Sequence, residues 1–563
     1  MIRWFGWQYP IGYTARTHHR ACEYAWLKCC RQEPWPIDRE RKMDIQARKL
    51  ADVLAVTTLA NVVPDQAVEF IGNAVDRAWA KQRADVLRHL APLTETIDRS
   101  AAAEIDVTLL DYYLGNLWNG LKCLAGPHRS GSWQWDSAEL EAEIICLRRA
   151  IRSKGFGQLP DIRRCQILTN LANCHSTTGR FVEAVGAWNA ALDIEPRFGM
   201  ARGNRAAGRW SYAKAVYDHG HAIVMAREAW RDLDPSTLEA LEPGAGEYFA
   251  GLRRDIERVV PAKAFQTPLD MTTFPLGTTD AEIEYRRWCL KNRLFLNPLN
   301  DLGAYEIAAQ DILSSPSIVV PIGQGPRFHG FFNQIKQEFC SARWLAYEAM
   351  SESEPHFSDK NVQLFNTLDY PSYSLATEKL KLAFRSAYSL LDKIAFLLNA
   401  YLGLAIPEKR VSFRGLWYEN QEKKKGIRQE FKTFPNWPLR GLYWLGKDLY
   451  EDTPEFRAGI DPDAQRLSEV RNHLEHKYFK LHLDFWSGPN VSGPTWLTDD
   501  LAVSLRREEF EAMTMRLIAL VRAAIIYLSL GIHQEERARA QKRPPDAIVP
   551  PMVLDVWDDE WKQ

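Results

Sequence analysis

Hydrophobic residues recur every three or four positions through most of the chain up to about residue 250. This spacing places apolar side chains on one face of an α-helix, and strand-like alternation is scarce. The pattern predicts a helical region over residues 1–254. From 255 to 365 proline and glycine become frequent, and one apolar, β-branched run, "SIVVPIGQGP", covers 317–326. We interpret 255–365 as a connecting region of mixed short elements.

Long helical patterns return in residues 366–545, which we predict to be a bundle of four or more helices. The predicted helices cover 374–404, 438–452, 461–485 and 507–533, and the last of them should end near Gly531. An acidic and aromatic tail, 546–563, closes the chain, and its sequence does not decide whether it docks or is disordered. The predicted fold is mainly all-α.

Within the first region, the segment 168–196 resembles the tetratricopeptide repeat. With Gly179 in the turn, the residues that fall at the fixed offsets of that pattern are Leu168, Leu171, Ala172, His175, Ala184, Trp188 and Pro196. Two further stretches, 109–153 and 201–229, look like an interrupted second copy and a third copy. Such repeats bury their apolar faces only by stacking, so three or more are expected. The alternative is an irregular helical domain with one accidental match.

Net charge, cysteine content and the apolar segments limit the classes of protein to which this sequence can belong. Lys+Arg (71) and Asp+Glu (72) nearly cancel, so any attraction to nucleic acid must come from a local patch. Nine scattered cysteines without a C-x-x-C pair favour reduced thiols over a disulfide framework. We find no signal-peptide pattern, and we expect the apolar segments 394–406 and 517–532 to be buried in protein and not in lipid. The expectation is a cytoplasmic protein without a membrane partner.

Known metal and nucleotide motifs have little support. The crowd formed by His18, His19, Cys22, Cys29 and Cys30 matches no zinc-binding spacing. The stretch "GLYWLGKD", 441–448, satisfies the G-x-x-x-x-G-K part of a phosphate-binding loop. However, Asp448 replaces the Ser or Thr that would bind magnesium, and the loop positions hold bulky aromatics. We therefore expect neither a metal nor a cofactor.

The segment "RNHLEH", 471–476, concentrates candidate chemistry in the predicted helix 461–485. A core-facing stripe recurs at three- and four-residue spacing through Leu467, Val470, Leu474, Tyr478, Leu481 and Phe485. At about 100° per residue, Asn472 and His476 lie roughly 160° and 200° from Leu474, opposite the core. Arg471 lies about 60° from Leu474, with Glu475 one turn along as its natural ion-pair partner. The alternative is a solvated, charged helix surface.

Positive charge gathers in residues 405–450, with ten Lys+Arg against five Asp+Glu. The RNA-binding candidates in this stretch are Lys423, Lys424, Lys425, Arg428, Trp417 and Tyr418. Cations contact phosphates and flat rings stack on unpaired bases, so the mixture predicts a site for single-stranded RNA. The alternative is a solvated loop whose aromatic residues belong to the core.

Arg471 and His476 form an R-x4-H motif on the penultimate long helix of the C-terminal bundle, and this motif resembles the signature of the HEPN superfamily. Three further segments, 288–303, 341–350 and 368–399, look like a bacterial family with helical repeats in front and a HEPN domain behind. The resemblance covers the last half of the chain well and the N-terminal quarter poorly.

The resemblance implies metal-independent RNA cleavage by a homodimer, in which two copies of the motif meet at a shared interface. His476 would move protons between the 2′-hydroxyl and the leaving 5′-oxygen, and Arg471 would stabilise the charge growing on phosphorus. Asn472 would orient either group, and His473 and Glu475 are possible auxiliary residues. Arg471 and His476 diverge by about 140° on one ideal helix, which a dimer could resolve by combining groups from two subunits.

In this reading the product carries a 2′,3′-cyclic phosphate, and the RNA partner is tRNA or mRNA. The repeats would bind a protein partner or trigger that regulates a toxin or antiphage-defence effector. The alternative function is a repeat-based adaptor whose HEPN bundle serves dimerisation or nucleotide or RNA binding without cleavage.

Overall fold

The structure is a computed structural model, and its helices account for nearly all of the regular structure in the part of the chain that it describes. Two short strands complete the regular elements of that part. The described residues are 50–562 without 126–133, 240, 242, 267–268, 353, 366, 368, 433–434, 451–466, 468–469, 472–473, 475–477 and 484–500. The predicted all-α class is confirmed.

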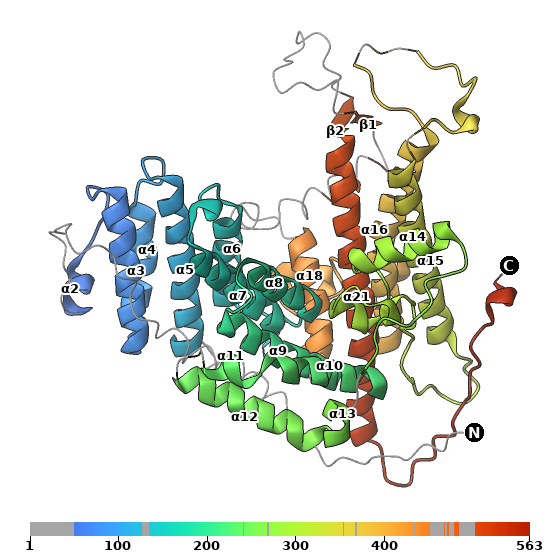
Figure 1. The fold of residues 1–563 in the computed structure, drawn as a ribbon, viewed down its shortest axis with the longest axis horizontal. Helices are drawn as coiled ribbons and strands as arrows, with labels where there is room; N and C mark the ends of the chain where they lie inside the picture. Colours follow the sequence, from blue (N-terminus) through green and yellow to red (C-terminus); the bar gives the residue numbers. More distant parts are fainter. Residues whose placement is uncertain are drawn as a thin grey trace.

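The first half of the chain is a succession of helices that follow one another from blue to green in Figure 1. They are α2 (Leu50–Ala55), α3 (Pro64–Ala80), α4 (Ala84–Leu93), α5 (Glu104–Ala125), α6 (Ala138–Arg152), α7 (Asp161–Thr178), α8 (Phe181–Ile194), α9 (Gly199–Ala215), α10 (His219–Asp232), α11 (Pro235–Glu239), α12 (Pro243–Val259) and α13 (Ala262–Gln266). Neighbouring helices pack as the pairs α5–α6, α7–α8 and α9–α10. These pairs coincide with the three predicted repeat copies.

The α7–α8 pair shows why this sequence folds as helix, turn, helix. Gly179 ends α7 with a φ of 87°, a left-handed conformation that glycine adopts without a steric penalty. Ala172 and Ala184 are fully buried between the two helices, where larger side chains would hold them apart. Trp188 is buried in the same contact, and its indole N–H donates to Asn173 Oδ1 at 3.1 Å. The helix pair is confirmed, whereas its membership of the tetratricopeptide class stays a prediction.

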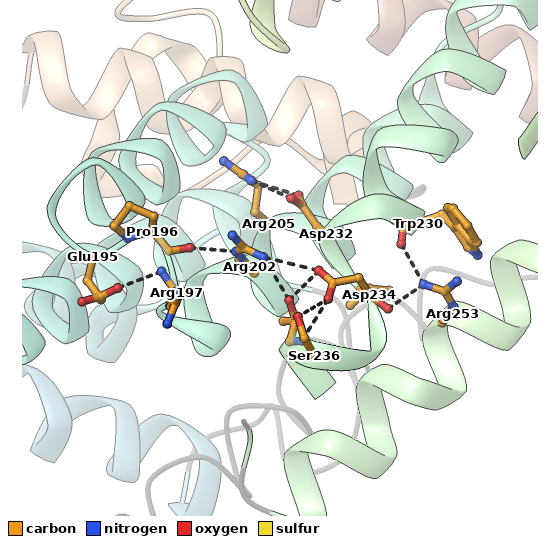
Figure 2. Close-up of polar contacts among 12 residues, drawn as sticks. Glu195, Pro196, Arg197, Arg202, Arg205, Trp230, Asp232, Asp234, Ser236 and Arg253 are labelled. Carbon is orange, nitrogen blue, oxygen red and sulfur yellow. Dashed lines mark hydrogen bonds and ion pairs between the residues drawn. The ribbon is translucent and has the colours of Figure 1, made fainter. Parts of the chain in front are cut away.

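Hydrogen bonds and ion pairs connect the helices that follow α8 in the N-terminal half, as Figure 2 shows. Arg205 of α9 donates from Nε to Asp232 at the end of α10 (2.9 Å), and Arg202 donates to Asp234 at 3.3 Å. From α12, Arg253 reaches back to the carbonyl oxygens of Trp230 (3.2 Å) and Leu233 (2.7 Å). Because these carbonyls end α10, the guanidinium satisfies acceptors that have no partner within their own helix. The network links α9, the end of α10, and α12.

Residues 280–351 contribute two helices, α14 (Asp280–Lys291) and α15 (Arg327–Ser351), and the segment between them is tied into the core. Asp301 accepts from Arg522 Nη1 at 2.7 Å and from the Tyr212 hydroxyl at 3.0 Å. Asp311 forms a two-point ion pair with Arg343 of α15, at 2.7 and 2.9 Å. These buried charges are paired, as burial requires. The region interpreted as a connector is therefore a packed part of the fold, and 317–326 forms no strand.

The C-terminal bundle is built on long helices that run side by side in Figure 1. Its elements are α16 (Leu375–Leu402), α17 (Gln429–Lys432), α18 (Trp437–Tyr450), β1 (Tyr478–His482), β2 (Ala502–Arg506) and α21 (Arg507–Gln541). α15 packs along α16, and both contact α21. α18 lies between α21 and the N-terminal helix α7, which places it at the junction of the two halves of the chain. The predicted helices 374–404 and 438–452 are confirmed.

The predicted end of the last helix is wrong, because α21 continues past Gly531 to Gln541. Gly531 serves close packing instead of termination. A Cβ atom at this position would lie 2.5 Å from Leu439 Cδ2 of α18, and the Gly531 carbonyl accepts from Asn436 Nδ2 at 2.9 Å. The missing side chain lets α18 approach α21.

Two features concern the surface of the molecule. Among the described residues, α21 is the one helix long and apolar enough to cross a membrane, but 83% of its most apolar window is buried inside the protein. It is the core helix of the bundle, as expected for the segment 517–532. After α21 the tail is extended, and its residues 544–562 include no buried side chain.

Candidate active site

The described residues at and before the candidate motif are helical, and three of them are buried. Leu467, Val470 and Leu474 are 0–4% exposed, which confirms this part of the predicted core-facing stripe. Arg471 is half-buried, and its Cζ lies 5.7 Å from the centre of the Tyr388 ring on α16. Asn472, His473, Glu475 and His476 lie outside the described residues. Arg471 is therefore the member of the predicted catalytic set that the structure places.

α16 supplies two groups that contact this segment. Tyr388, 4% exposed, presents its ring to the Arg471 guanidinium. One turn earlier, Arg385 donates from Nη2 to the backbone carbonyl of Leu474. Residues three positions apart lie on the same helix face, so one face of α16 contacts the motif at two points. Neither residue carries a local sequence pattern that could have predicted this role, since each contact joins positions more than 80 residues apart in the sequence.

Tyr450, the last residue of α18, also packs against Tyr388. The rings of Tyr388 and Tyr450 meet edge to face, with centroids 6.4 Å apart. Burial raises the pKa of Tyr450 well above its usual value, and the neighbouring Tyr388 and Asp392 act in the same direction. Arg471 acts in the opposite direction on the pKa of Tyr450, which places its positive charge near this phenol. Asp392 itself accepts from the Phe413 backbone N–H at 2.9 Å.

The chain after the motif is a strand, which corrects the predicted helix 461–485. β1 pairs in parallel with β2, with Tyr478 opposite Ala502 and His482 opposite Arg506. Leu481 is buried as expected, but Tyr478 is 39% exposed. In the run "YFKLH" the apolar residues fit both helical spacing and strand alternation, and short runs of this kind are ambiguous by period alone. The β-forming aromatics and the pairing with β2 decide for the strand.

An ion pair between a buried lysine and a partly exposed aspartate anchors β1 to the loop before α16. Lys480, 3% exposed, donates to Asp369 at 2.6 Å. The Ser372 backbone N–H donates to the Leu481 carbonyl at 2.7 Å, and Phe479 packs on Phe510 of α21 with ring centres 5.2 Å apart. Contacts with the loop before α16 and with α21 thus hold β1 in place. Because β1 begins two residues after the motif, these contacts also fix the position of the chain there.

The residues of the predicted RNA-binding loop fall into two groups, exposed lysines and buried side chains. Lys423, Lys424 and Lys425 form an exposed turn, whereas Trp417 is 1% and Tyr418 9% exposed. Trp417 packs against Phe413, Phe431 and Tyr443 at ring distances of 5.9, 5.2 and 5.9 Å. Arg428, 7% exposed, lies 3.7 Å from Glu430. The two aromatic rings are core residues in this fold, so they cannot stack on bases here, and the alternative of a solvated loop over core aromatics describes them.

The phosphate-loop-like stretch 441–448 is part of the continuous helix α18 and has structural roles. Lys447 is fully buried and donates to Asp136 at 2.7 Å and to Glu141, both before or in α6. Burial lowers the pKa of Lys447, but the two carboxylates outweigh burial and raise it to about 12. A Lys447 ammonium held in this way has no free path to a phosphate. Gly441 meets the backbone of Gly179, where a Cβ atom would lie 2.3 Å from the Gly179 carbonyl oxygen.

Asp448 is the centre of a second buried cluster. Arg148 of α6 forms a two-point ion pair with it, at 2.8 and 2.7 Å, and Arg180 also donates to it. Burial alone would raise the pKa of Asp448, but the two guanidinium groups hold it well below its usual range. Arg180 continues to Glu183 at 2.9 Å, and Glu183 accepts from Tyr527 of α21. The charges of 441–448 thus tie α18 to the N-terminal helices.

Within the described part of the chain, no group of three or more His, Cys, Asp or Glu side chains could hold a metal ion. The five His and Cys residues between positions 18 and 30 lie outside that part.

Comparison with known proteins gives one match. Residues 319–535 match the LA2681-like HEPN family, so the chain carries a C-terminal HEPN domain. The match begins before α15 and ends within α21, and it includes Arg471 and His476. HEPN domains are generally associated with ribonuclease activity, so the match suggests a nuclease-like function. No curated protein and no solved structure matches the chain.

Proposed function

We propose that this protein is a metal-independent HEPN endoribonuclease. The observation that carries the proposal is the placement of the R-x4-H pair, Arg471 and His476, inside the matched HEPN domain. Arg471 supports it further, because its guanidinium is half-buried against Tyr388 at the edge of the bundle and not inside the core. A cation in this position suits an anionic ligand that approaches from outside.

In the proposed reaction, the 2′-hydroxyl of the RNA attacks the adjacent phosphorus and the 5′-oxygen leaves, which gives a 2′,3′-cyclic phosphate. His476 acts as the acid or base, because a histidine pKa near neutral suits proton transfer in both directions. Arg471 stabilises the charge on the phosphate oxygens through its planar set of N–H donors. Asn472 orients either group. Two subunits share the site in a homodimer.

Regulation by the N-terminal helices forms the second part of the proposal. These helices bind a protein partner or trigger, and the cleavage serves a toxin or antiphage-defence role in the cytoplasm. The buried contacts of α18 with Arg148, Arg180 and Asp136 support this idea, since they join the N-terminal half directly to an element of the HEPN domain. The exposed turn at 423–425 is the proposed contact with the RNA backbone, be it tRNA or mRNA.

Cleavage of RNA by the purified chain tests this proposal. The wild type is incubated with tRNA and with total RNA in the presence of EDTA, beside His476→Ala and Arg471→Ala. We expect cleavage by the wild type, with 2′,3′-cyclic phosphate ends, and a loss of about a hundredfold or more in each variant, as is typical for an acid–base or charge-stabilising group. Equal cleavage by all three proteins would exclude the site.

A second function is favoured by one observation. Burial of Trp417 and Tyr418 removes the predicted stacking platform for RNA bases. This fits an adaptor whose HEPN bundle serves dimerisation or binding without cleavage. A wild type that cleaves neither RNA pool but retains one specific protein partner in pull-down experiments would favour the adaptor.

A further inference from the structure

The inference concerns how Arg471 is held. Its guanidinium carbon lies 5.7 Å from the centre of the Tyr388 ring, and three residues later the Leu474 carbonyl accepts from Arg385. Both contacts come from one face of α16, where Arg385 and Tyr388 are one turn apart. The spacing of three residues on α16 therefore matches the spacing of three residues between Arg471 and Leu474.

We propose that Tyr388 is a positioning residue for Arg471, with Arg385 fixing the backbone of the same segment. The inference rests on the proposed function, in which Arg471 acts on the phosphate of the RNA. An aromatic face attracts a guanidinium through its quadrupole and uses none of its N–H donors for a hydrogen bond. A carboxylate in the same place would neutralise the charge. A ring can thus orient an arginine without itself neutralising the positive charge.

Tyr388 is itself immobilised, which a positioning residue requires. Its side chain is 4% exposed, and its ring lies between Phe384, stacked at 6.5 Å, and Tyr450, edge to face at 6.4 Å. Phe384 in turn packs on Phe510 of α21 at 5.3 Å. The ring beneath Arg471 is held by α16, α18 and α21, so the direction of the guanidinium is set by three helices of the bundle.

The competing explanation is that Tyr388 only fills the core. A double-mutant cycle separates the two explanations, because a residue that acts through Arg471 has nothing left to lose once Arg471 is gone. The set comprises Tyr388→Phe, Tyr388→Leu, Arg471→Ala and the double variant Tyr388→Leu/Arg471→Ala. Ser389→Ala, at an exposed position on the same helix, is the matched control.

RNA cleavage in EDTA gives the first readout. Tyr388→Phe keeps the ring and should retain kcat within about threefold, while Tyr388→Leu should lower kcat by roughly tenfold with little change in KM. In the Arg471→Ala background, Tyr388→Leu should add no further loss. The inference would be overturned if the fold-loss of kcat in the double variant equalled the product of the two single losses. Equal losses of kcat in Tyr388→Phe and Tyr388→Leu would also overturn it. Thermal unfolding of each variant confirms that the compared proteins are folded.

The second readout does not depend on activity. Phenylglyoxal modifies arginine side chains, and peptide mass spectrometry gives the rate at Arg471. Tyr388→Leu should raise this rate at least severalfold over the wild type and over Ser389→Ala, whereas Tyr388→Phe should not. Equal rates in all four proteins would overturn the inference. If the wild type cleaves no RNA, the proposed function fails, and these rates still decide whether Tyr388 holds Arg471.

Discussion

One carboxylate, Asp448, joins two arginines that come from different helices of the N-terminal half. It accepts from Arg148 at 2.8 and 2.7 Å and from Arg180, and it stands in α18 of the HEPN domain. Each ion costs several kcal/mol to bury alone, and only the mutual attraction in a well-formed cluster offsets this. The Asp448 carboxylate is therefore a main electrostatic link between α18 and the N-terminal helices.

Replacing Asp448 by Asn should destabilise the protein strongly. The change removes the carboxylate that pairs with the buried Arg148 and leaves Arg180 with Glu183 alone, which costs about 3–5 kcal/mol at neutral pH. Urea unfolding at pH 7 measures the difference from the wild type. Because the pKa of Asp448 is held below its usual range, its contribution is complete above the unfolded-state pKa and decreases as pH falls below it.

The difference between wild type and Asp448→Asn should therefore shrink by about 1 kcal/mol between pH 7 and pH 3. Unfolding of both proteins at pH 7, 5, 4 and 3 checks this, and the subtraction removes the effect of every other carboxylate. A difference that stays constant over this range would show that the Asp448 carboxylate is not held at a lowered pKa.

At the scale of elements, the packing of α18 depends on a glycine without a side chain as well as on its large aromatic residues. Gly441 lies so close to the Gly179 turn that a Cβ atom would meet the carbonyl oxygen at 2.3 Å. The neighbouring indole groups of Trp437 and Trp444 donate to the carbonyls of Ser176 and Trp135, at 2.7 and 2.9 Å. These bonds satisfy the carbonyl groups of Ser176 in α7 and of Trp135 in the loop before α6, and they require α18 to stay close to both segments.

Gly441→Ala should separate these backbones and cost about 1–3 kcal/mol, the usual range for an overpacked contact. Gly186→Ala is the control, because Gly186 lies within α8 and a Cβ atom there would meet no atom within 4 Å. Alanine at such a helical position is neutral or stabilising by up to about 1 kcal/mol. Thermal unfolding of both variants compares them, and a Gly441→Ala protein as stable as Gly186→Ala would contradict the close contact.

Sequence periodicity predicted the long helices well and the short elements poorly. The helix predicted at 374–404 is α16, because a pattern of eight turns leaves no other period that fits. The predicted helix 461–485 extends too far, since Tyr478 and Leu481 of β1 fit a helical stripe although the segment pairs with β2 as a strand. In the candidate site, Arg471 was found from its spacing to His476. Tyr388 and Arg385 were not, because only the fold brings them to the motif.

At the scale of the whole molecule, helices from both halves of the chain contribute to one large core, beside a separate buried cluster built mainly by α2–α5. Leu140 of α6, Phe181 of α8, Leu442 of α18 and Ile525 of α21 belong to the same buried cluster. No sequence pattern could show this, because the pair of Arg148 with Asp448 joins positions 300 apart. The division into 1–254, 255–365 and 366–545 stays a prediction about organisation along the chain, and it does not describe separate cores.

A fragment that begins at residue 319 should therefore fail to fold stably, although it contains the entire family match. It would expose the apolar face of α18 and leave Lys447 and Asp448 without Asp136, Arg148 and Arg180. Circular dichroism with urea unfolding measures this, beside the full chain, in which the helices of the HEPN domain should unfold together with the N-terminal helices that share their core. A soluble fragment with a cooperative transition of its own would contradict the shared core.

The burial of α18 has a consequence for how such a protein can change over evolutionary time. A nuclease domain that completes its own interior can be exchanged between genes as a unit. Here the helix at the junction receives its partners from Arg148, Arg180 and Asp136, all outside the matched domain. A recombination event that joined residues 319–535 to a foreign N-terminal half would have to reproduce those partners, so the two halves are expected to be inherited together.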